Sequence, residues 1–226
     1  MIRVLFAFVL FCAALPARAD VDIKEMTTPG GIQTWLVEDH SIPFVVLELR
    51  FRGGASLDAP GKRGATNLMT ALLEEGAGDL DSRAFARATE SLAASFSYDV
   101  SNDAVSVSAR FLSENRDDAL ALLRQSLVNP RFDEDAIERV RAQVLSIIQS
   151  DLKDPSEIAG RAFDTLVYGE HPYGSSLNGS LEVVSALNRD DLLAAHRAAL
   201  ARDRLYVSAV GDVTEAELRA ILDQLL

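Results

Sequence analysis

The order of strand-like and helix-like segments along this chain of 226 residues is the feature that most constrains its fold. Two stretches rich in β-branched and aromatic residues come first, two helical patterns follow, and a hairpin pattern comes next. We expect strands at residues 31–40 and 42–54, helices at 64–75 and 82–93, and hairpin strands at 94–100 and 104–112. The regular alternation of strand and helix that is typical of a parallel sheet is missing from this order.

The second half of the chain is mostly helical. A helix is expected to begin at Asn115 or Asp117 and to run to Leu127, and a long amphipathic helix is expected from Asp133 to Lys153. The remaining pattern predicts a helix at 156–168, a turn-rich loop at 169–180, a helix at 188–200, a strand at 204–213 and a helix at 214–226. Together these elements predict an α+β fold, with a single mixed, mostly antiparallel sheet and helices packed on one face.

The first nineteen residues have the layout of a secretory signal peptide. Arg3 gives a positive start, an apolar stretch runs from Val4 to Leu15, and Ala17-Arg18-Ala19 forms a cleavage site. The apolar stretch is too short to cross roughly 30 Å of hydrocarbon, so we expect export with cleavage and no membrane span afterwards. The single cysteine, Cys12, lies in this segment. A cysteine-free domain of residues 20–226 in the periplasm, or secreted, is therefore expected.

Composition and side-chain spacing exclude several kinds of site. The net charge of −12 argues against nucleic-acid binding, which needs basic patches that neutralise phosphates. His40, His171 and His196 each lack a second ligand at helical spacing, so each is interpreted as a surface, loop or packing residue. Glu74 and Glu75 are adjacent on a helix and point about 100° apart, which favours a solvated helix end over a catalytic dyad. The residues alone therefore offer no convincing active site.

Three long segments, taken together, resemble the insulinase/pitrilysin type of zinc peptidase, which includes mitochondrial processing peptidase. They read LRFRGGASLDAPGKRGATNLMTALLEEGA, LVNPRFDEDAIERVRAQVLSIIQSDLKDPSEIAGRAFDTLVYGEHPYGSSLNG and RDDLLAAHRAALARDRLYVSAVGDVTEAEL. They follow the order of that family's zinc helix, long ligand-bearing helix with its HPYG loop, and closing strand and helix. The resemblance covers nearly the whole of residues 20–226.

Active members of that family carry H-x-x-E-H on the first helix, with a glutamate ligand on the long helix. The two histidines hold Zn²⁺, and the glutamate between them is the general base for a metal-bound water. Matching Gly64 to the family's leading glycine places Asn67 and Ala71 where the histidines belong and Thr70 where the base belongs. Ile147, or Ser146 after a slip of one residue, stands at the third ligand. The resemblance thus implies no catalytic residue, no metal site and no cofactor in this chain.

Non-catalytic members of the family often pair with a zinc-bearing half, and the two halves enclose peptide substrate. The resemblance therefore implies a scaffold or chamber half whose partner is a zinc-bearing peptidase subunit or a second domain. It also implies an edge strand at Ser97, Tyr98, Asp99 and Val100 that pairs with a peptide main chain. Two alternatives remain open at this point. One is a structural or assembly protein of the same fold with no peptide role, and the other is an active zinc endopeptidase with an atypical site.

Overall fold

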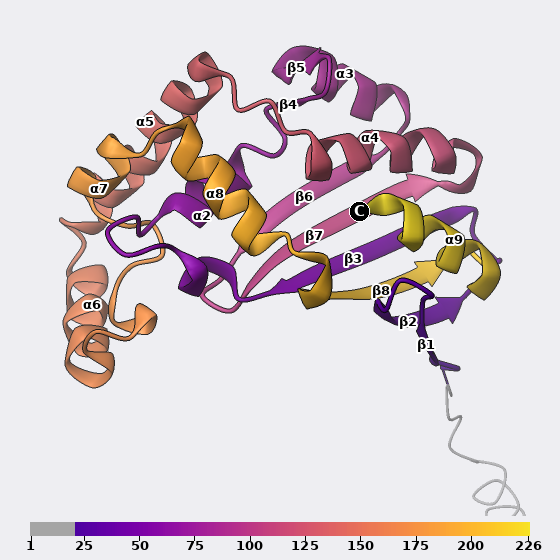
Figure 1. The fold of residues 1–226 in the computed structure, drawn as a ribbon, viewed down its shortest axis with the longest axis horizontal. Coiled ribbons are helices and arrows are strands. Elements are labelled where there is room, and N and C mark those ends of the chain that lie inside the picture. Colours follow the sequence, from indigo (N-terminus) through magenta and orange to yellow (C-terminus); the bar gives the residue numbers. More distant parts are fainter. Residues whose placement is uncertain (1–20) are drawn as a thin grey trace, which may run out of the picture.

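The computed structural model describes residues 21–226, which form one six-stranded sheet with helices around it (Figure 1). The predicted signal peptide at residues 1–19 lies outside these residues. The strands follow the order β1-β2-β8-β3-β7-β6; β2 and β8 run parallel, and the other neighbours run antiparallel. The expectation of a mixed, mostly antiparallel sheet is therefore confirmed. The strands are β1 Lys24–Thr27, β2 Gln33–Glu38, β3 Phe44–Arg52, β6 Ser95–Val100, β7 Ala104–Leu112 and β8 Leu205–Gly211.

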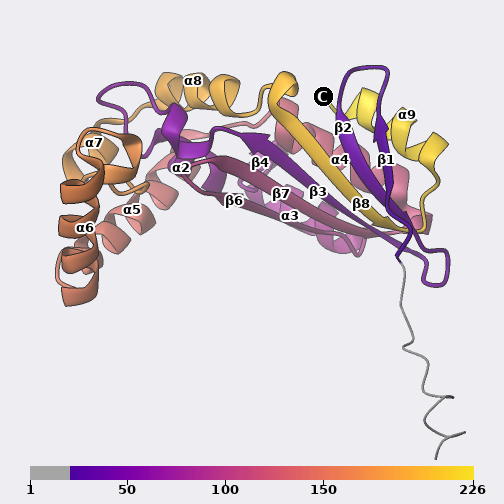
Figure 2. The same cartoon turned by 90° about the horizontal axis from the view of Figure 1, so that it is seen from below.

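One face of this sheet is buried, and the other is largely uncovered. In β3, Val45, Leu47 and Leu49 are buried, whereas Glu48 and Arg50, whose side chains alternate with them, lie on the open face. The strands β7 and β8 alternate in the same way. Figure 2 shows α4, α8 and α9 together on one side of the sheet. These helices are α4 Arg116–Val128, α8 Arg189–Ala199 and α9 Glu215–Leu225.

Two further helices lie near the edge strand β6. The helix α2 (Ala65–Ala71) packs against β6 and α8, and its buried apolar residues belong to the main core. The helix α3 (Ser82–Ser91) lies beside the short strands β4 (Gly76–Ala77) and β5 (Leu80–Asp81). Its Phe85 forms a small separate cluster with Ala77 and Leu122.

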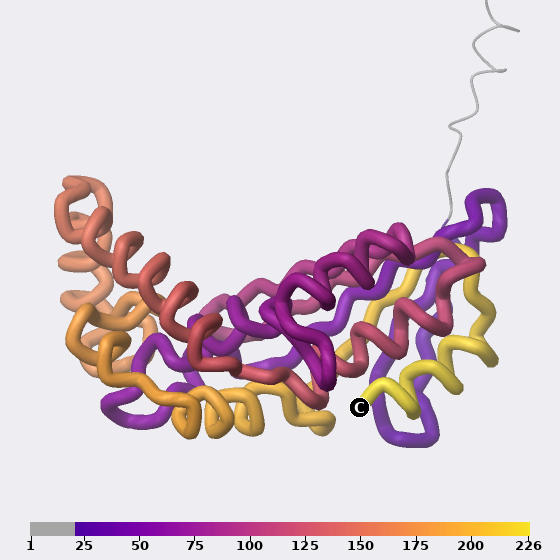
Figure 3. Tube along the Cα trace, turned by 90° about the horizontal axis from the view of Figure 1, so that it is seen from above, coloured from indigo at the N-terminus to yellow at the C-terminus, as the bar shows by residue number. Residues whose placement is uncertain are grey.

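The remaining helices form an arm beyond the end of the sheet. They are α5 Glu134–Asp151, α6 Pro155–Tyr168 and α7 Leu181–Ala186. Figure 3 shows the chain bent into an arc with α5 and α6 rising at one end, and Figure 2 shows the arm bending away from the side that carries α8. The uncovered sheet face therefore lies on the concave side. Single turns of 3-10 helix connect several elements: η1 Gly54–Leu57, η2 Ser113–Asn115, η3 Pro172–Gly174 and η4 Arg202–Arg204.

The structure differs from the sequence expectation at several elements, among them the short strands β4 and β5, which were not expected. The strand β1 was not expected, and it forms by antiparallel pairing with β2 although its sequence KEMT is short and polar. The helix expected to reach residue 75 ends at Ala71. The amides of Leu72 and Leu73 there donate to the carbonyls of Met69 and Thr70, three residues back, as in a 3-10 turn. The helix α7 was also not expected, and Ser180 caps it by accepting a bond from the Val183 amide. Within residues 21–226, we find no helix that combines the length and the apolar character required to cross a bilayer.

Candidate functional site

A buried carboxylate fixes the start of α2, the helix that matches the zinc helix of the resembled family. Gly64 precedes the helix with φ 99° and has no side chain to cap it. Asp58 takes that role: its Oδ2 accepts from the Gly64 amide at 2.8 Å, and its Oδ1 accepts from the Thr66 amide and hydroxyl at 2.8 and 2.7 Å. The Asp58 side chain is only 3% exposed. A carboxylate from outside the helix therefore satisfies its free amides.

The three motif positions on α2 carry side chains that are already occupied or inert. The Asn67 amide donates from Nδ2 to the Asn178 Oδ1 at 3.0 Å, which ties the helix to the loop after η3. Thr70 is 2% exposed, and its hydroxyl donates back to the Thr66 carbonyl at 2.8 Å. Ala71 presents only a methyl group. This face of α2 therefore supplies neither an imidazole ligand for zinc nor a carboxylate base.

The fourth position lies on α5, which packs against α2. Val144 and Ile148 on α5 are buried, whereas Ile147 between them is 50% exposed and Ser146 is also exposed. The helix thus turns residue 147 away from the core. Among residues 21–226, no group of three or more His, Cys, Asp or Glu side chains is arranged to hold a metal ion.

Arg63 holds the loop that follows η3 against the start of α2. Its guanidinium donates to the carbonyls of Pro172 and Ser176, at 3.0 and 3.2 Å, and to the Asn102 side chain at 2.5 Å. Burial lowers the pKa of this guanidinium, although Asp58 lies close enough to oppose that effect. The Arg63 guanidinium therefore links three segments: the loop around η3, the turn between β6 and β7, and the start of α2.

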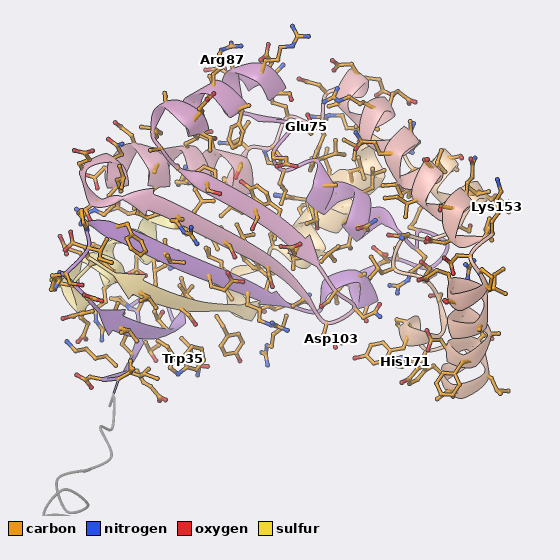
Figure 4. All side chains as sticks on the ribbon, turned by 180° about the vertical axis from the view of Figure 1, so that it is seen from behind. Trp35, Glu75, Arg87, Asp103, Lys153 and His171 are labelled. Atoms are coloured by element: carbon orange, nitrogen blue, oxygen red, sulfur yellow. The ribbon has the colours of Figure 1, made fainter. Side chains whose placement is uncertain are left out.

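A second contact ties the same loop to the same turn. The Tyr173 hydroxyl donates to the Asp103 carboxylate at 2.6 Å, and the His171 Nδ1 accepts from the Tyr173 amide at 3.2 Å. Figure 4 shows Asp103 and His171 at the end of the sheet next to the arm. His171 is thus a loop-stabilising residue, as the sequence predicts.

The other two histidines also take structural partners. His40, expected to be solvated, is half exposed and pairs through Nδ1 with the Asp212 Oδ1 at 2.7 Å, a contact that raises the pKa of His40. His196 belongs to α8, and its Nε2 donates to the Leu127 carbonyl at 2.9 Å, while burial lowers its pKa.

Within the part of the chain that the structure describes, residues 21–226, the strand β6 forms one outer edge of the sheet and pairs with β7 alone. Its Ser97 and Asp99 side chains are exposed, whereas Tyr98 and Val100 are partly buried against the core. The Tyr98 hydroxyl lies 2.6 Å from the Ser126 hydroxyl, and burial raises its pKa. Tyr98 therefore anchors the strand, while the unpaired main chain of β6 stays open to another strand.

A hollow of about 360 Å³ borders this edge. It lies between α3 and the start of β6, and its lining includes Glu74, Phe85, Glu90 and Phe96. Partial burial, together with the neighbouring charge of Glu75, raises the pKa of Glu74. Glu75 itself is not the solvated residue that the sequence predicts, because its side chain accepts from the Ser82 hydroxyl at 2.6 Å and pairs with an arginine.

The open sheet face carries an aromatic pair that the sequence analysis missed. The rings of Trp35 on β2 and Tyr206 on β8 stack with centroids 6.0 Å apart, and the Arg52 guanidinium lies 4.9 Å from the Tyr206 centroid. Figure 4 shows Trp35 near the other end of this face. The period-two alternation within β2 and β8 could have revealed this pair, because it places both rings on the face opposite the buried side chains.

Comparison with known proteins identifies the protein family that shares this sequence pattern and fold. The family model described as Insulinase (Peptidase family M16) matches residues 34–180. A relative named "Non-peptidase homolog YmxG" from Helicobacter pylori is 28% identical over 176 residues, which cover 78% of this chain and 41% of the relative. An uncharacterized zinc protease named YmxG from Bacillus subtilis is 20% identical, with 88% of this chain and 49% of the relative covered.

Two solved structures share the fold. A Pseudomonas fluorescens structure described as a peptidase M16 inactive domain superposes with a TM-score of 0.86 at 28% identity, covering 91% of this chain and 50% of that chain. A protease from Helicobacter pylori superposes with a TM-score of 0.79 at 17% identity, covering 92% of this chain and 50% of that one. The chain thus spans about half the length of the relatives it matches.

Proposed function

Because the chain belongs to the insulinase family of peptidases (family M16), we propose that it is a non-catalytic member that forms one wall of a peptide-enclosing chamber. The single observation that carries this proposal is the set of side chains on the face of α2 that matches the family's zinc helix. Asn67, Thr70 and Ala71 stand there in place of two imidazoles and a carboxylate. Two matches support the loss of catalysis, since one is named a non-peptidase homolog and the other is described as an inactive domain.

Two features of the concave side favour a role in enclosing peptide over a purely structural role. The sheet face on that side is uncovered and displays Trp35 and Tyr206, whose flat rings suit contact with an extended chain. The edge of β6 offers unpaired main-chain groups, to which a peptide can add as a further strand. A zinc-bearing subunit or second domain would then supply the reaction, in the periplasm or outside the cell as residues 1–19 predict.

The hollow beside β6 points to a preference for basic peptides. A strand added to β6 would place some of its side chains near Glu74 and Glu90, both of which line the hollow. Phe85 and Phe96 give the same hollow apolar walls, which suit the aliphatic stem of a lysine or arginine. We therefore expect an extended peptide with a basic side chain to bind more tightly than its neutral counterpart.

Peptide binding tests this role directly. The probe is a fluorescent ten-residue peptide with one central arginine, compared with the same peptide carrying glutamine there, and anisotropy measures the dissociation constant. The double variant Glu74→Gln/Glu90→Gln should weaken binding of the arginine peptide by about tenfold, which corresponds to about 1.4 kcal/mol. The exposed Glu114 offers a matched control as Glu114→Gln. Equal binding of both peptides would contradict the preference for a basic side chain, and no binding of either would contradict the peptide role itself.

Proteolysis tests the loss of catalysis. The purified chain should leave a quenched fluorescent peptide uncut, with or without added zinc. Chelator-sensitive cleavage by the chain alone would favour the alternative of an atypical active enzyme. Purification of the protein from its natural source distinguishes the other alternative: a complex that contains a zinc-bearing family member supports the chamber role, and a stable complex that contains no peptidase supports a structural role.

A further inference from the structure

Two arginines lie beside the aromatic pair on the open sheet face. Arg50 and Arg52 alternate with the buried residues of β3, and both are exposed. Arg50 is paired in register with Tyr206 on β8, and the Arg52 guanidinium lies 4.9 Å from the centroid of the same ring. Trp35, on the strand at the other side of β8, stacks with Tyr206. The cationic–aromatic cluster is defined here as Trp35, Arg50, Arg52 and Tyr206.

Neither arginine is neutralised by a carboxylate of the described chain. The ion pairs within residues 21–226 engage other cations, and neither Arg50 nor Arg52 takes part in one. Glu48 lies on the same strand and face, but its carboxylate accepts from the Ser108 hydroxyl on β7. In a chain with a formal net charge of −12, two neighbouring cations without a carboxylate partner are thus available to an anionic ligand. A guanidinium binds a carboxylate through two parallel N–H···O bonds.

The surroundings of the cluster fit a single carboxylate better than a chain of anions. Glu48 on β3 and Asp99 on β6 lie on the same open face, on the side of the arginines away from Trp35 or along their strand. A nucleic acid would have to place its phosphates against these carboxylates, and like charges repel. An extended peptide avoids this cost, because it presents one acidic side chain to the arginines and neutral residues elsewhere. The flat rings of Trp35 and Tyr206 then suit contact with the neighbouring residues of the peptide.

We propose that the cationic–aromatic cluster binds an acidic side chain of the enclosed peptide. The inference rests on the proposed function and deepens it, because it assigns a second position at which the peptide is recognised. The first position is the hollow beside β6, where Glu74 and Glu90 favour a basic side chain. The preferred peptide therefore carries a basic and an acidic residue at a separation that the sheet determines.

The sheet topology gives this separation. The strand β3 lies two strands from β6, and a peptide added to β6 would lie one strand further out. Neighbouring strands are about 4.8 Å apart, so roughly 14 Å across the sheet separates such a peptide from Arg50. An extended chain advances about 3.3 Å per residue, so roughly five residues span this distance. We therefore expect the acidic residue about five or six residues from the basic one, in a part of the peptide that crosses the sheet face.

Trp35 provides a local readout, because it is the only tryptophan in the chain. The probes are two fifteen-residue peptides that lack tryptophan and carry one central arginine. One peptide has a glutamate six residues to either side of the arginine, and the other has glutamine at both places. Two flanking glutamates make the test independent of the direction in which the peptide lies. We expect the glutamate peptide to bind at least tenfold more tightly and to change the Trp35 emission at saturation.

Charge reversal at one arginine assigns the effect to the cluster. Arg50→Glu should abolish both the preference for the glutamate peptide and the change in Trp35 emission. Arg50→Gln should reduce the preference without adding a negative charge, and it serves as a second variant if the reversal disturbs the sheet. The matched control is Arg197→Glu, which makes the same change of charge at an exposed position of α8, on the covered side of the sheet. The control should leave both readouts unchanged.

The outcomes separate this inference from the proposed function. Equal affinity for the two peptides, with the preference for a central arginine retained, would refute the role of the cluster and leave the peptide role standing. Equal losses in Arg50→Glu and Arg197→Glu would also refute it, since overall charge would then explain the effect. Tighter binding of a fifteen-nucleotide oligothymidylate than of the glutamate peptide would overturn the choice of a peptide as the ligand. If neither peptide binds, both the inference and the proposed function fail.

Discussion

The carboxylate of Asp58 should be one of the most important single groups for keeping α2 in place. It accepts three hydrogen bonds, from the Gly64 amide and from the Thr66 amide and hydroxyl, at 2.7 to 2.8 Å. The substitution Asp58→Asn keeps the size and shape of the side chain but replaces one acceptor oxygen with an NH₂ donor. Whichever way the amide turns, a donor then faces a backbone N–H.

The size of the effect follows from that geometry. One buried N–H loses its acceptor, at a cost of about 1–3 kcal/mol, and the remaining bonds lose the strength that an ionised acceptor gives them. The nearby Arg63 also loses its closest carboxylate, 3.8 Å away. Together we expect the free energy of unfolding to fall by about 3 kcal/mol, which corresponds to roughly 6–12 °C in melting temperature for a domain of this size.

Equilibrium unfolding in urea, followed by circular dichroism, measures this change. The midpoint should fall while the slope m stays constant, since the surface exposed on unfolding is the same. Asp154→Asn is the matched control, because Asp154 caps α6 through the Ser156 amide at 2.7 Å but lies exposed on a helix with no buried residue. It should cost less than about 1 kcal/mol. Equal losses in the two variants, or a loss below about 1 kcal/mol for Asp58→Asn, would refute the argument.

The remaining predictions concern pH and the loop after η3. Burial lowers the pKa of His196, so the unfolded chain binds the proton more readily and stability should fall as the pH drops below about 6.5; urea titrations should show this dependence flattened in His196→Gln. The hydrogen bond with Asp212 raises the pKa of His40, so protonated His40 contributes to the free energy of unfolding below pH 6.5, and this contribution is lost as the pH rises. His40→Gln should remove this pH dependence, which is opposite in sign to that of His196. Gly179→Ala should lower the free energy of unfolding by about 2 kcal/mol or more, since φ is +78° and a Cβ would lie 2.2 Å from the Arg63 carbonyl oxygen. Gly160→Ala, in open space on α6, should cost nothing in the same urea assay.

Much of the sheet could be predicted because its pattern is local. In β3 and β7, polar residues such as Glu48, Arg50, Ser106 and Ser108 alternate with apolar ones along part of the strand, which specifies a strand with one buried face. The strand β1 has only four residues and one buried side chain, Met26, so its own sequence carries almost no signal. It exists because β2 offers an edge for pairing. The unexpected end of α2 has a similar cause, since Leu72 and Leu73 are both fully buried by a turn that places them in the core rather than on a helix face.

The same distinction between local and long-range information applies to the residues of the candidate site. Residue identity at positions 67, 70 and 71 is local, and it suffices to predict that zinc chemistry is missing once the family resemblance places the motif. The partners of those residues are not local: Asn67 bonds Asn178, and Arg63 bonds the carbonyl of Ser176, each more than a hundred residues away. Sequence spacing says nothing about such contacts, so the loop could only be recognised as a turn.

The contacts around α2 show how the protein's own side chains hold this helix in place. In an active relative, a zinc ion held between α2 and the long helix would itself tie the two elements together. Here the buried Asp58 carboxylate accepts from the Gly64 amide at the start of α2. The Asn67 side-chain amide donates to Asn178 in the loop after η3. Neither contact involves Ile147, whose side chain is 50% exposed on α5. Loss of the zinc ligands, which the family resemblance implies, therefore need not loosen the fold.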